Sequence, residues 1–382
     1  MNYTCPLIEI SGKPHARGVQ YGKVARPQIE RGVRHYVGQL EKLGFGRHKI
    51  HETVRAYLPV MEAYDIDCVD EMRGIAEGAE LPLEDIAFLN ARTEVVKLGQ
   101  NPQLREKAGL AGLSDECTSA LALPAATRDG TVIQGQNWDW KLECAESTVV
   151  LKIRRDDGPD VLTFTEAGGL ARSGMNSAGI AITSNYLDCE RDYRELGIPL
   201  LLTRRKMLEA THLPLVTQIV YGTKRSGSNN IMASHCGGVG YNLECAPDEV
   251  FAIFDDDGLI THANHWNAPA AKAKLRDLGI ANTPDTLLRD CRVNQILSAE
   301  RGSITRETFK KAFLDDYQHP YSVCRPPRES TTMAASATVA SIIMEPELGI
   351  MELAILPALN PEYTTYTLEM SHVAQTKAAA AE

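Results

Sequence analysis

The sequence predicts an α+β protein in which β-sheets are covered by helices. Apolar residues before Cys117 recur mostly at helical spacing, whereas the chain after Cys117 consists mainly of short strand-like runs. Helical patterns then interrupt the strands near residues 199–222 and 283–315. Strands and helices that alternate in blocks are typical of sheets layered against helices.

The composition limits the class of protein. The 382 residues suffice for one large domain or two ordinary ones, and the apolar (43%) and charged (24%) fractions are those of soluble globular proteins. A net charge of −10 without a dense basic patch argues against a nucleic-acid surface, and no run approaches the roughly 18 apolar residues that a membrane span needs. The nine cysteines lack paired spacing and the first residues lack a signal-peptide pattern, so we expect a cytoplasmic protein.

The first part of the chain is predicted to contain one strand and four helices. Residues 81–85 combine a proline with acidic residues, as expected where a helix begins. Residues 99–116 mix Pro, Gly, Lys and Glu without periodicity, and we expect the exposed loop that a cleavage point requires. The predicted strand covers residues 7–12, and the helices cover 15–43, 51–64, 68–77 and 81–98.

The second part is predicted to be mostly strands. A glycine-punctuated strand pair ends at residues 180–185, residues 255–258 form a hairpin turn, and the alanine-rich tail after His372 is frayed. The other predicted strands cover residues 117–123, 131–140, 149–154, 161–166, 230–234, 240–245, 250–254, 259–263, 337–344 and 350–356, and helices cover 199–210, 214–222, 283–298 and 305–315.

Cys117 and Thr118 open a strand where the pattern changes from helical to extended. A polar pair at this boundary indicates a processing point, so we expect Cys117 to be a nucleophile that becomes a new chain end. Asp139 lies between Trp138 and Trp140 in the next strand, where a charge needs either a polar face or a partner. We expect Asp139 to serve Cys117 from that strand, although a buried core cysteine and a surface acid are the plainer interpretations.

Two later segments hold further candidates. Residues 261–266 end a strand and contain Asn264, and residues 322–327 place a lone arginine, Arg325, among prolines. The plainer interpretations are a turn residue for Asn264 and a surface ion pair for Arg325.

We expect no metal site. His262 and His265, with His235 and Cys236, are a candidate zinc set, but a spacing of three in a strand points two imidazoles to opposite faces, and no Cys-x-x-Cys accompanies them. The acidic run at residues 255–258 lacks the alternating ligands and the distal Glu of a calcium loop.

Several of these motifs together resemble a known family. Cys117-Thr118, residues 134–139 (Gln-Gly-Gln-Asn-Trp-Asp), Asn264-His265 and Cys324-Arg325 are similar to the acyl-coenzyme A:6-aminopenicillanic acid acyltransferase family, the isopenicillin N acyltransferase-like proteins. The glycine-rich residues 166–185 and the segment 199–209 are similar too, so the resemblance covers nearly the whole chain in order.

The resemblance implies an N-terminal nucleophile hydrolase with a four-layer αββα core, made as a precursor that cuts itself just before the cysteine. It implies a single domain over residues 1–382, divided into an α chain (1–116) and a β chain (117–382) that remain together as a heterodimer.

The resemblance also implies a role for each matching residue. Cys117 matches the nucleophile after cleavage of the Glu116–Cys117 bond, and Asp139 matches the aspartate that orients the nucleophile and the new amine. Asn264 matches the side-chain donor of the oxyanion hole, and Arg325 matches an arginine near the nucleophile.

Some positions stay open or depart from the family. The second oxyanion donor, a backbone N–H, falls near Asn185 or Tyr186. Glu116 stands where the fungal enzyme has glycine, which bears on whether cleavage is complete. Gln136 stands where bile-salt hydrolases have arginine, which argues against a bile-salt or penicillin V substrate.

Elementary acid–base chemistry agrees with these roles. The pKa of a free thiol is about 8.5 and that of a free α-amine is about 7.7–8.0, so the new amine can take the thiol proton without a separate histidine base. Arg325 is expected to favour the thiolate and Asp139 to hold the ammonium form.

The sequence thus predicts a self-processing cysteine amidohydrolase or acyltransferase that acts on a small-molecule N-acyl amide through a thioester. Hydrolysis is the preferred alternative because no coenzyme A motif is visible, and no cofactor is expected, although a coenzyme A thioester stays open as an acyl donor. The rivals are a papain-like hydrolase that pairs Cys236 or Cys117 with His262 or His265, and a binding protein that keeps the fold without activity.

Overall fold

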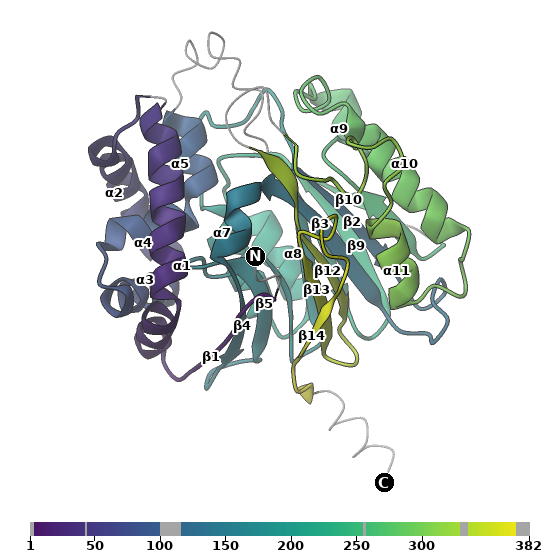
Figure 1. The fold of residues 1–382 in the computed structure, drawn as a ribbon, viewed down its shortest axis with the longest axis horizontal. Coiled ribbons are helices and arrows are strands. Elements are labelled where there is room, and N and C mark those ends of the chain that lie inside the picture. Colours follow the sequence, from purple (N-terminus) through teal and green to yellow (C-terminus); the bar gives the residue numbers. More distant parts are fainter. Residues whose placement is uncertain (1–3, 43, 100–115, 255–256, 329–334, 372–382) are drawn as a thin grey trace.

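A computed structural model describes residues 4–42, 44–99, 116–254, 257–328 and 335–371. Two β-sheets lie face to face in the middle of the molecule, and helices cover the outer side of each (Figure 1). The four-layer αββα sandwich expected of an N-terminal nucleophile hydrolase is therefore confirmed. Of the loop predicted over residues 99–116, residue 99 ends a helix and residue 116 begins a strand, and residues 100–115 lie outside the described residues, as do turn residues 255–256 and the tail from residue 372.

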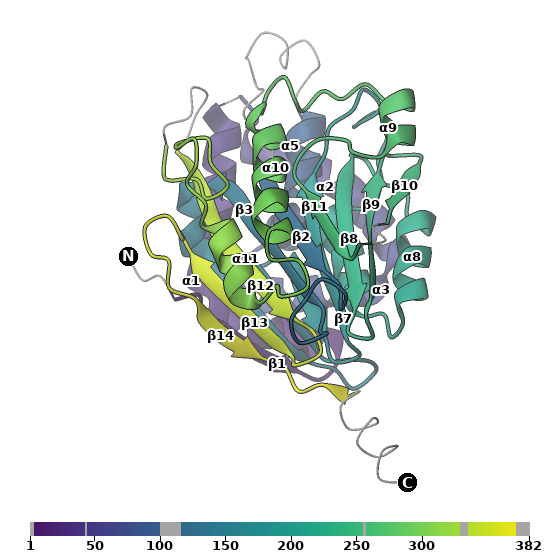
Figure 2. The same cartoon turned by 90° about the vertical axis from the view of Figure 1, so that its right-hand side faces the viewer.

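The six-stranded sheet holds the strand that begins beside Cys117. Its order is β11-β2-β3-β12-β13-β14, and helices α10 and α11 cover its outer face (Figure 2). Phe309 and Phe313 of α11 pack there with Ala120 and Ala122 of β2. The elements are β2 (Glu116–Ala122), β3 (Ile133–Lys141), β11 (Leu259–His262), β12 (Ser336–Glu345), β13 (Ile350–Ile355), β14 (Thr364–Thr367), α10 (Asp285–Ser298) and α11 (Arg306–Phe313).

The eight-stranded sheet has the order β1-β4-β5-β6-β7-β8-β9-β10. Its strands pair antiparallel except for β1, which runs parallel to β4 at the edge. The strands are β1 (Leu7–Ser11), β4 (Thr148–Arg154), β5 (Val161–Glu166), β6 (Ser173–Asn176), β7 (Ile180–Tyr186), β8 (Asn229–His235), β9 (Val239–Cys245) and β10 (Val250–Ile253).

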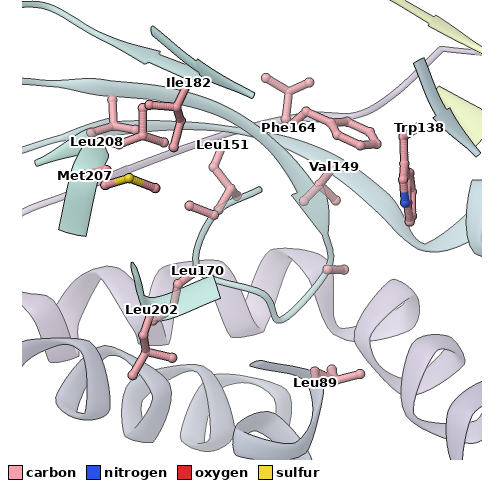
Figure 3. Packing of buried hydrophobic residues seen from close by; sticks show 14 of the residues in the cluster. Leu89, Trp138, Val149, Leu151, Phe164, Leu170, Ile182, Leu202, Met207 and Leu208 are labelled. Atoms are coloured by element: carbon pink, nitrogen blue, oxygen red, sulfur yellow. The ribbon is translucent and has the colours of Figure 1, made fainter. Parts of the chain in front are cut away.

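Helices from the first third of the chain, with α7 and α8, lie against this sheet, and a large cluster of apolar side chains is buried there (Figure 3). Phe164 packs against Trp138, which belongs to the other sheet; the two rings are in an edge-to-face arrangement with their centroids 5.7 Å apart. The remaining elements are α1 (Pro14–Lys42), α2 (Arg47–Tyr64), α3 (Ile66–Ala79), α4 (Leu83–Asn90), α5 (Arg92–Gly99), the 3₁₀ helix η2 (Leu142–Ser147), α7 (Leu200–Leu208), α8 (Leu213–Gly222) and α9 (Pro269–Lys274).

Helices α1 and α3 cross at very close range. A Cβ atom at Gly18 would lie 2.1 Å from the carbonyl oxygen of Glu71, so the crossing requires glycine. The buried Glu71 carboxylate accepts hydrogen bonds from Arg17 of α1 and Arg205 of α7. These contacts fix the amino-terminal helices to an element that follows Cys117 by more than 80 residues.

Two sequence-based predictions are wrong. The helix predicted over residues 81–98 is two helices, because the chain turns at Ala91, where the Asn90 amide donates to the Gly168 carbonyl oxygen (2.8 Å) and accepts from the Leu170 N–H (2.9 Å). The predicted hairpin at residues 255–258 does not form, because β10 and β11 belong to different sheets.

No helix within the described ranges combines the length and the apolar character that crossing a membrane would require.

Candidate active site

Cys117 lies in β2, in the interior of the six-stranded sheet. In the register with β3, Glu116 is opposite Asp139 and Cys117 is opposite Trp138. Successive side chains of a strand face opposite sides, so these two neighbours enter different environments. Cys117 is fully buried in the apolar cluster between the sheets, whereas Glu116 faces Arg289 of α10.

Three polar groups hold Cys117. Its backbone N–H donates to Oδ1 of Asn264 at 2.8 Å, and its carbonyl oxygen accepts from Nη1 of Arg289 at 2.7 Å. The sulfur lies 3.8 Å from Nη2 of Arg172, whose guanidinium stacks 4.2 Å from the ring centroid of Trp138. Backbone and sulfur are thus positioned by separate groups.

Asn264 is fixed from both ends of its amide. Oδ1 accepts the Cys117 N–H and also Nη2 of Arg289 at 2.9 Å, while Nδ2 donates to the carbonyl oxygen of Tyr186 at 2.9 Å. The backbone N–H of Asn264 donates to Oγ1 of Thr286. Two donors at Oδ1 define the amide orientation, because the flipped amide would oppose donor to donor.

A buried cluster of three carboxylates and two guanidiniums lies on the α10 side of β2. Arg325 pairs with Glu116 and with Asp285, and its Nε is 3.5 Å from Oδ2 of Asp139. Arg289 bonds Oδ2 of Asp285 at 3.0 Å and lies 3.6 Å from Oε2 of Glu116 and 3.9 Å from Oδ2 of Asp139. With all groups ionised, the cluster carries one excess negative charge.

The pKa values of the two aspartates in this cluster are shifted in opposite directions. Burial raises the pKa of Asp139, although Arg325, Arg289 and the 2.7 Å hydrogen bond from Thr338 Oγ1 oppose the rise. Burial also acts to raise the pKa of Asp285, but Arg289 and Arg325 outweigh it and lower that pKa to about 2. Asp285 is therefore the permanent counter-ion, and Asp139 is the acid that can change its protonation.

Four of the residues predicted from the sequence meet here: Cys117, Asp139, Asn264 and Arg325. Arg325 lies among carboxylates, however, and the arginine beside the sulfur is Arg172.

A backbone N–H near Asn185 or Tyr186 as the second oxyanion donor stays a prediction, and other groups of these two residues make the following contacts. The Asn185 amide donates to the carbonyl oxygens of His262 and Ala263, and its Oδ1 accepts from Ser119 and Gln136. Asn185 therefore connects the two sheets. The Tyr186 backbone carbonyl positions Asn264.

The histidines are arranged differently from the prediction. The rings of His262 and His265 stack 6.2 Å apart, and do not point to opposite faces, because β11 ends at His262. Within the described residues, His262 bonds Glu244 at 2.8 Å and His265 bonds Thr286 at 3.0 Å, and no group of three His, Cys, Asp or Glu side chains suits a metal ion.

Sequence reasoning missed Arg172, Asp285, Arg289 and Thr338. Asp285 and Arg289 were detectable as an i, i+4 charge pair on a predicted helix, and Arg172 lies in the glycine-rich segment that was singled out. Thr338 gave no signal, because one hydroxyl inside a strand looks like any other.

Comparison with known proteins supports an acyltransferase family. The family model for acyl-coenzyme A:6-aminopenicillanic acid acyl-transferase matches residues 126–355. A relative from Emericella nidulans (strain FGSC A4), the acyl-coenzyme A:6-aminopenicillanic-acid-acyltransferase 40 kDa form, is 29% identical over 335 residues, which cover 86% of this chain and 87% of the relative.

Solved structures of two hydrolases are also similar. A variant of the conjugated bile acid hydrolase from Clostridium perfringens has a TM-score of 0.46 at 13% identity, covering 65% of this chain and 92% of that chain. Penicillin V acylase from Agrobacterium tumefaciens has a TM-score of 0.45 at 11% identity, covering 66% and 86%. The family assignment rests on the family model, which spans more than half of the sequence: this chain belongs to the acyl-coenzyme A:6-aminopenicillanic acid acyltransferase family.

Proposed function

We propose that the chain is a self-processing cysteine enzyme that cleaves a small N-acyl amide, or transfers its acyl group, through a thioester on Cys117. The observation that supports this most is that both sides of the Glu116–Cys117 bond are held. Arg325 pairs with the Glu116 side chain, Asn264 and Arg289 bind the Cys117 backbone, and Arg172 lies at the sulfur.

In the proposed processing step, the Cys117 sulfur attacks the Glu116 carbonyl carbon. A C–S bond forms, the C–N bond of the peptide breaks, and the nitrogen gains a proton to become the α-amine of Cys117. Water then hydrolyses the thioester, which returns the thiol and leaves a carboxylate on Glu116. The products are an α chain of residues 1–116 and a β chain of residues 117–382.

In the proposed turnover, the new α-amine takes the thiol proton and the sulfur attacks the substrate amide. Asn264 would serve both states: its Oδ1 accepts from the Cys117 nitrogen, and Nδ2, which donates one N–H to the Tyr186 carbonyl oxygen, would donate its second N–H to the oxyanion. Arg172 stabilises negative charge on sulfur, and Asp139, which is opposite Glu116 on the neighbouring strand, is the carboxylate that would hold the ammonium form of the new amine. Water releases an acid, whereas an amine acceptor gives a new amide; hydrolysis is the outcome we favour.

Intact mass of the purified protein tests the proposal directly. Fragments of 116 and 266 residues share 41.9 kDa, or about 13 and about 29 kDa. The larger fragment is expected to begin Cys-Thr-Ser-Ala, and both are expected to co-elute under native conditions. Cys117→Ala is expected to stay uncut, whereas Cys236→Ala, a half-buried cysteine in the turn after β8, is expected to be cut normally. An uncut wild-type chain that still turns over an amide would refute the proposal.

A further inference from the structure

We infer that Arg325 and Arg289 form a carboxylate subsite, which Glu116 fills before cleavage and which afterwards takes a five-carbon dicarboxylic acyl group such as glutaryl. This inference rests on the proposed self-processing at Cys117, and it specifies the class of acyl group that the same site accepts.

Glu116 is the one member of the charge cluster that would leave. Its side chain is 15% exposed, pairs with Arg325 and lies 3.6 Å from Nη2 of Arg289. The cut separates Glu116 from β2, whereas both arginines, Asp139 and Asp285 belong to the β chain. Cleavage therefore removes a bound anion from beside two buried cations.

The charge balance that remains favours an anion. Three carboxylates face two guanidiniums before cleavage; once Glu116 and its new α-carboxylate have moved away with the end of the α chain, two carboxylates face the same two guanidiniums. Burial disfavours the charged form of Asp139, and the new α-amine adds positive charge. A buried guanidinium that loses one of its partners is costly unless another anion replaces it.

The chemistry of processing sets the length of the acyl group. In the first acyl transfer, Glu116 itself is the acyl group, and three carbons separate its carbonyl carbon from its carboxylate. A glutaryl amide reproduces this spacing. Sulfur attacks its amide carbon, the C–S bond forms, the C–N bond breaks, and the amine leaves with the proton from the Cys117 ammonium. Water then releases glutarate and restores the thiol.

Position 116 provides a first test, because the mature β chain is the same whatever residue stands there. The rate of self-cleavage, followed by intact mass, is expected to be highest with glutamate. Glu116→Gln keeps the shape but loses the charge, and is expected to cut about 10-fold more slowly or worse. Glu116→Asp keeps the charge but shortens the reach, and is expected to be intermediate. Equal rates for glutamate and glutamine would overturn the inference.

Acylation of the mature enzyme provides a second test that needs no knowledge of the amine half. The probes are N-acetylcysteamine thioesters of glutarate, of its neutral isostere 5-amino-5-oxopentanoate, and of pentanoate. The rate of acyl transfer to Cys117 is followed by intact mass. Glutaryl is expected to react at least about 10-fold faster than the isostere.

The charge preference should depend on the subsite. In Arg325→Gln the glutaryl-to-isostere ratio is expected to fall to about one, whatever the absolute rates, whereas Arg292→Gln, an arginine of α10 stacked on Tyr317, is expected to keep the ratio. Acylation without charge preference would overturn the subsite and leave the proposed function standing. An uncut chain, or a mature Cys117 that none of the three thioesters acylates, would overturn both.

Discussion

The guanidinium of Arg172 lies 3.8 Å from the sulfur of Cys117 and stacks on Trp138, the residue opposite Cys117 in the sheet. The cation is thus held by the nucleophile's own strand partner. A stacked, buried guanidinium loses little freedom when it contacts a thiolate, so its electrostatic effect is preorganised.

Replacing Arg172 is expected to reduce the fraction of Cys117 that is ionised at neutral pH. In Arg172→Met, alkylation of Cys117 by iodoacetamide at neutral pH should slow by about 10-fold or more, and its pH profile should move to higher pH, because the charge that favours the ionised sulfur is gone. Arg172→Lys should recover part of the effect. Arg292→Met removes another arginine stacked on an aromatic ring and should leave the profile unchanged. An unchanged profile in Arg172→Met would assign Arg172 to packing alone.

Substitutions of Asn264 are expected to affect self-cleavage and acylation to different extents. Asn264→Asp keeps an acceptor for the Cys117 nitrogen but loses the amide donor, whereas Asn264→Ala loses both. We expect the aspartate variant to be cut faster than the alanine variant, yet to acylate about 10²–10³-fold more slowly than wild type, because a missing oxyanion donor acts in the transition state. Intact mass measures cutting, and the thioester probes measure acylation. Wild-type acylation rates in Asn264→Asp would exclude the donor role.

Thr338 is expected to set the acid limit of activity. Burial raises the pKa of Asp139, so its ionised form is lost, as the pH falls, at a higher pH than for an ordinary carboxyl group. Thr338 donates to Oδ1 of Asp139 and stabilises the ionised form. In Thr338→Val the acid side of the cleavage and acylation profiles should therefore move to higher pH, whereas Thr338→Ser should keep the wild-type profile. A shift toward lower pH in the valine variant would contradict this role.

Gly18 is expected to limit the stability of the helical layer. An alanine Cβ there would lie 2.1 Å from the Glu71 carbonyl oxygen, so Gly18→Ala should lower the free energy of unfolding by about 1–3 kcal/mol. Gly38 lies in the same helix with nothing within 4 Å of its added Cβ, and Gly38→Ala should be neutral or stabilise by up to about 1 kcal/mol. Denaturant titration measures both, and equal effects would show that the crossing can relax.

The sequence predicted the layers of the fold well and their connections less well. Periodicity identifies a strand such as β10 or β11, but it does not identify the sheet that the strand joins, and for this reason the hairpin at residues 255–258 was wrong. The break at Ala91 depends on Asn90 binding backbone groups near residue 170, a contact with no local signal.

The residues of the candidate site likewise divide into those that the sequence predicts and those that only the structure reveals. Cys117 and Asp139 were predictable because their motifs are distinctive and lie on adjacent strands of one sheet, where Asp139 is opposite Glu116, the residue before Cys117. Arg172 and Arg289 act on Cys117 from 55 and 172 residues away along the chain. Such pairings depend on tertiary packing, which neither spacing nor composition encodes.

The parallel pairing of β1 with β4 has a practical consequence. Strand β1 precedes the proposed cut in the sequence and β4 follows it. In the same way, Glu71 precedes the cut and accepts a hydrogen bond from Arg205, which follows it. If the chain is cut as proposed, these contacts predict that the amino-terminal portion stays bound to the rest of the protein after cleavage. A gene split at the codon for Cys117 should yield two polypeptides that are each insoluble when expressed alone and that complement one another when co-expressed.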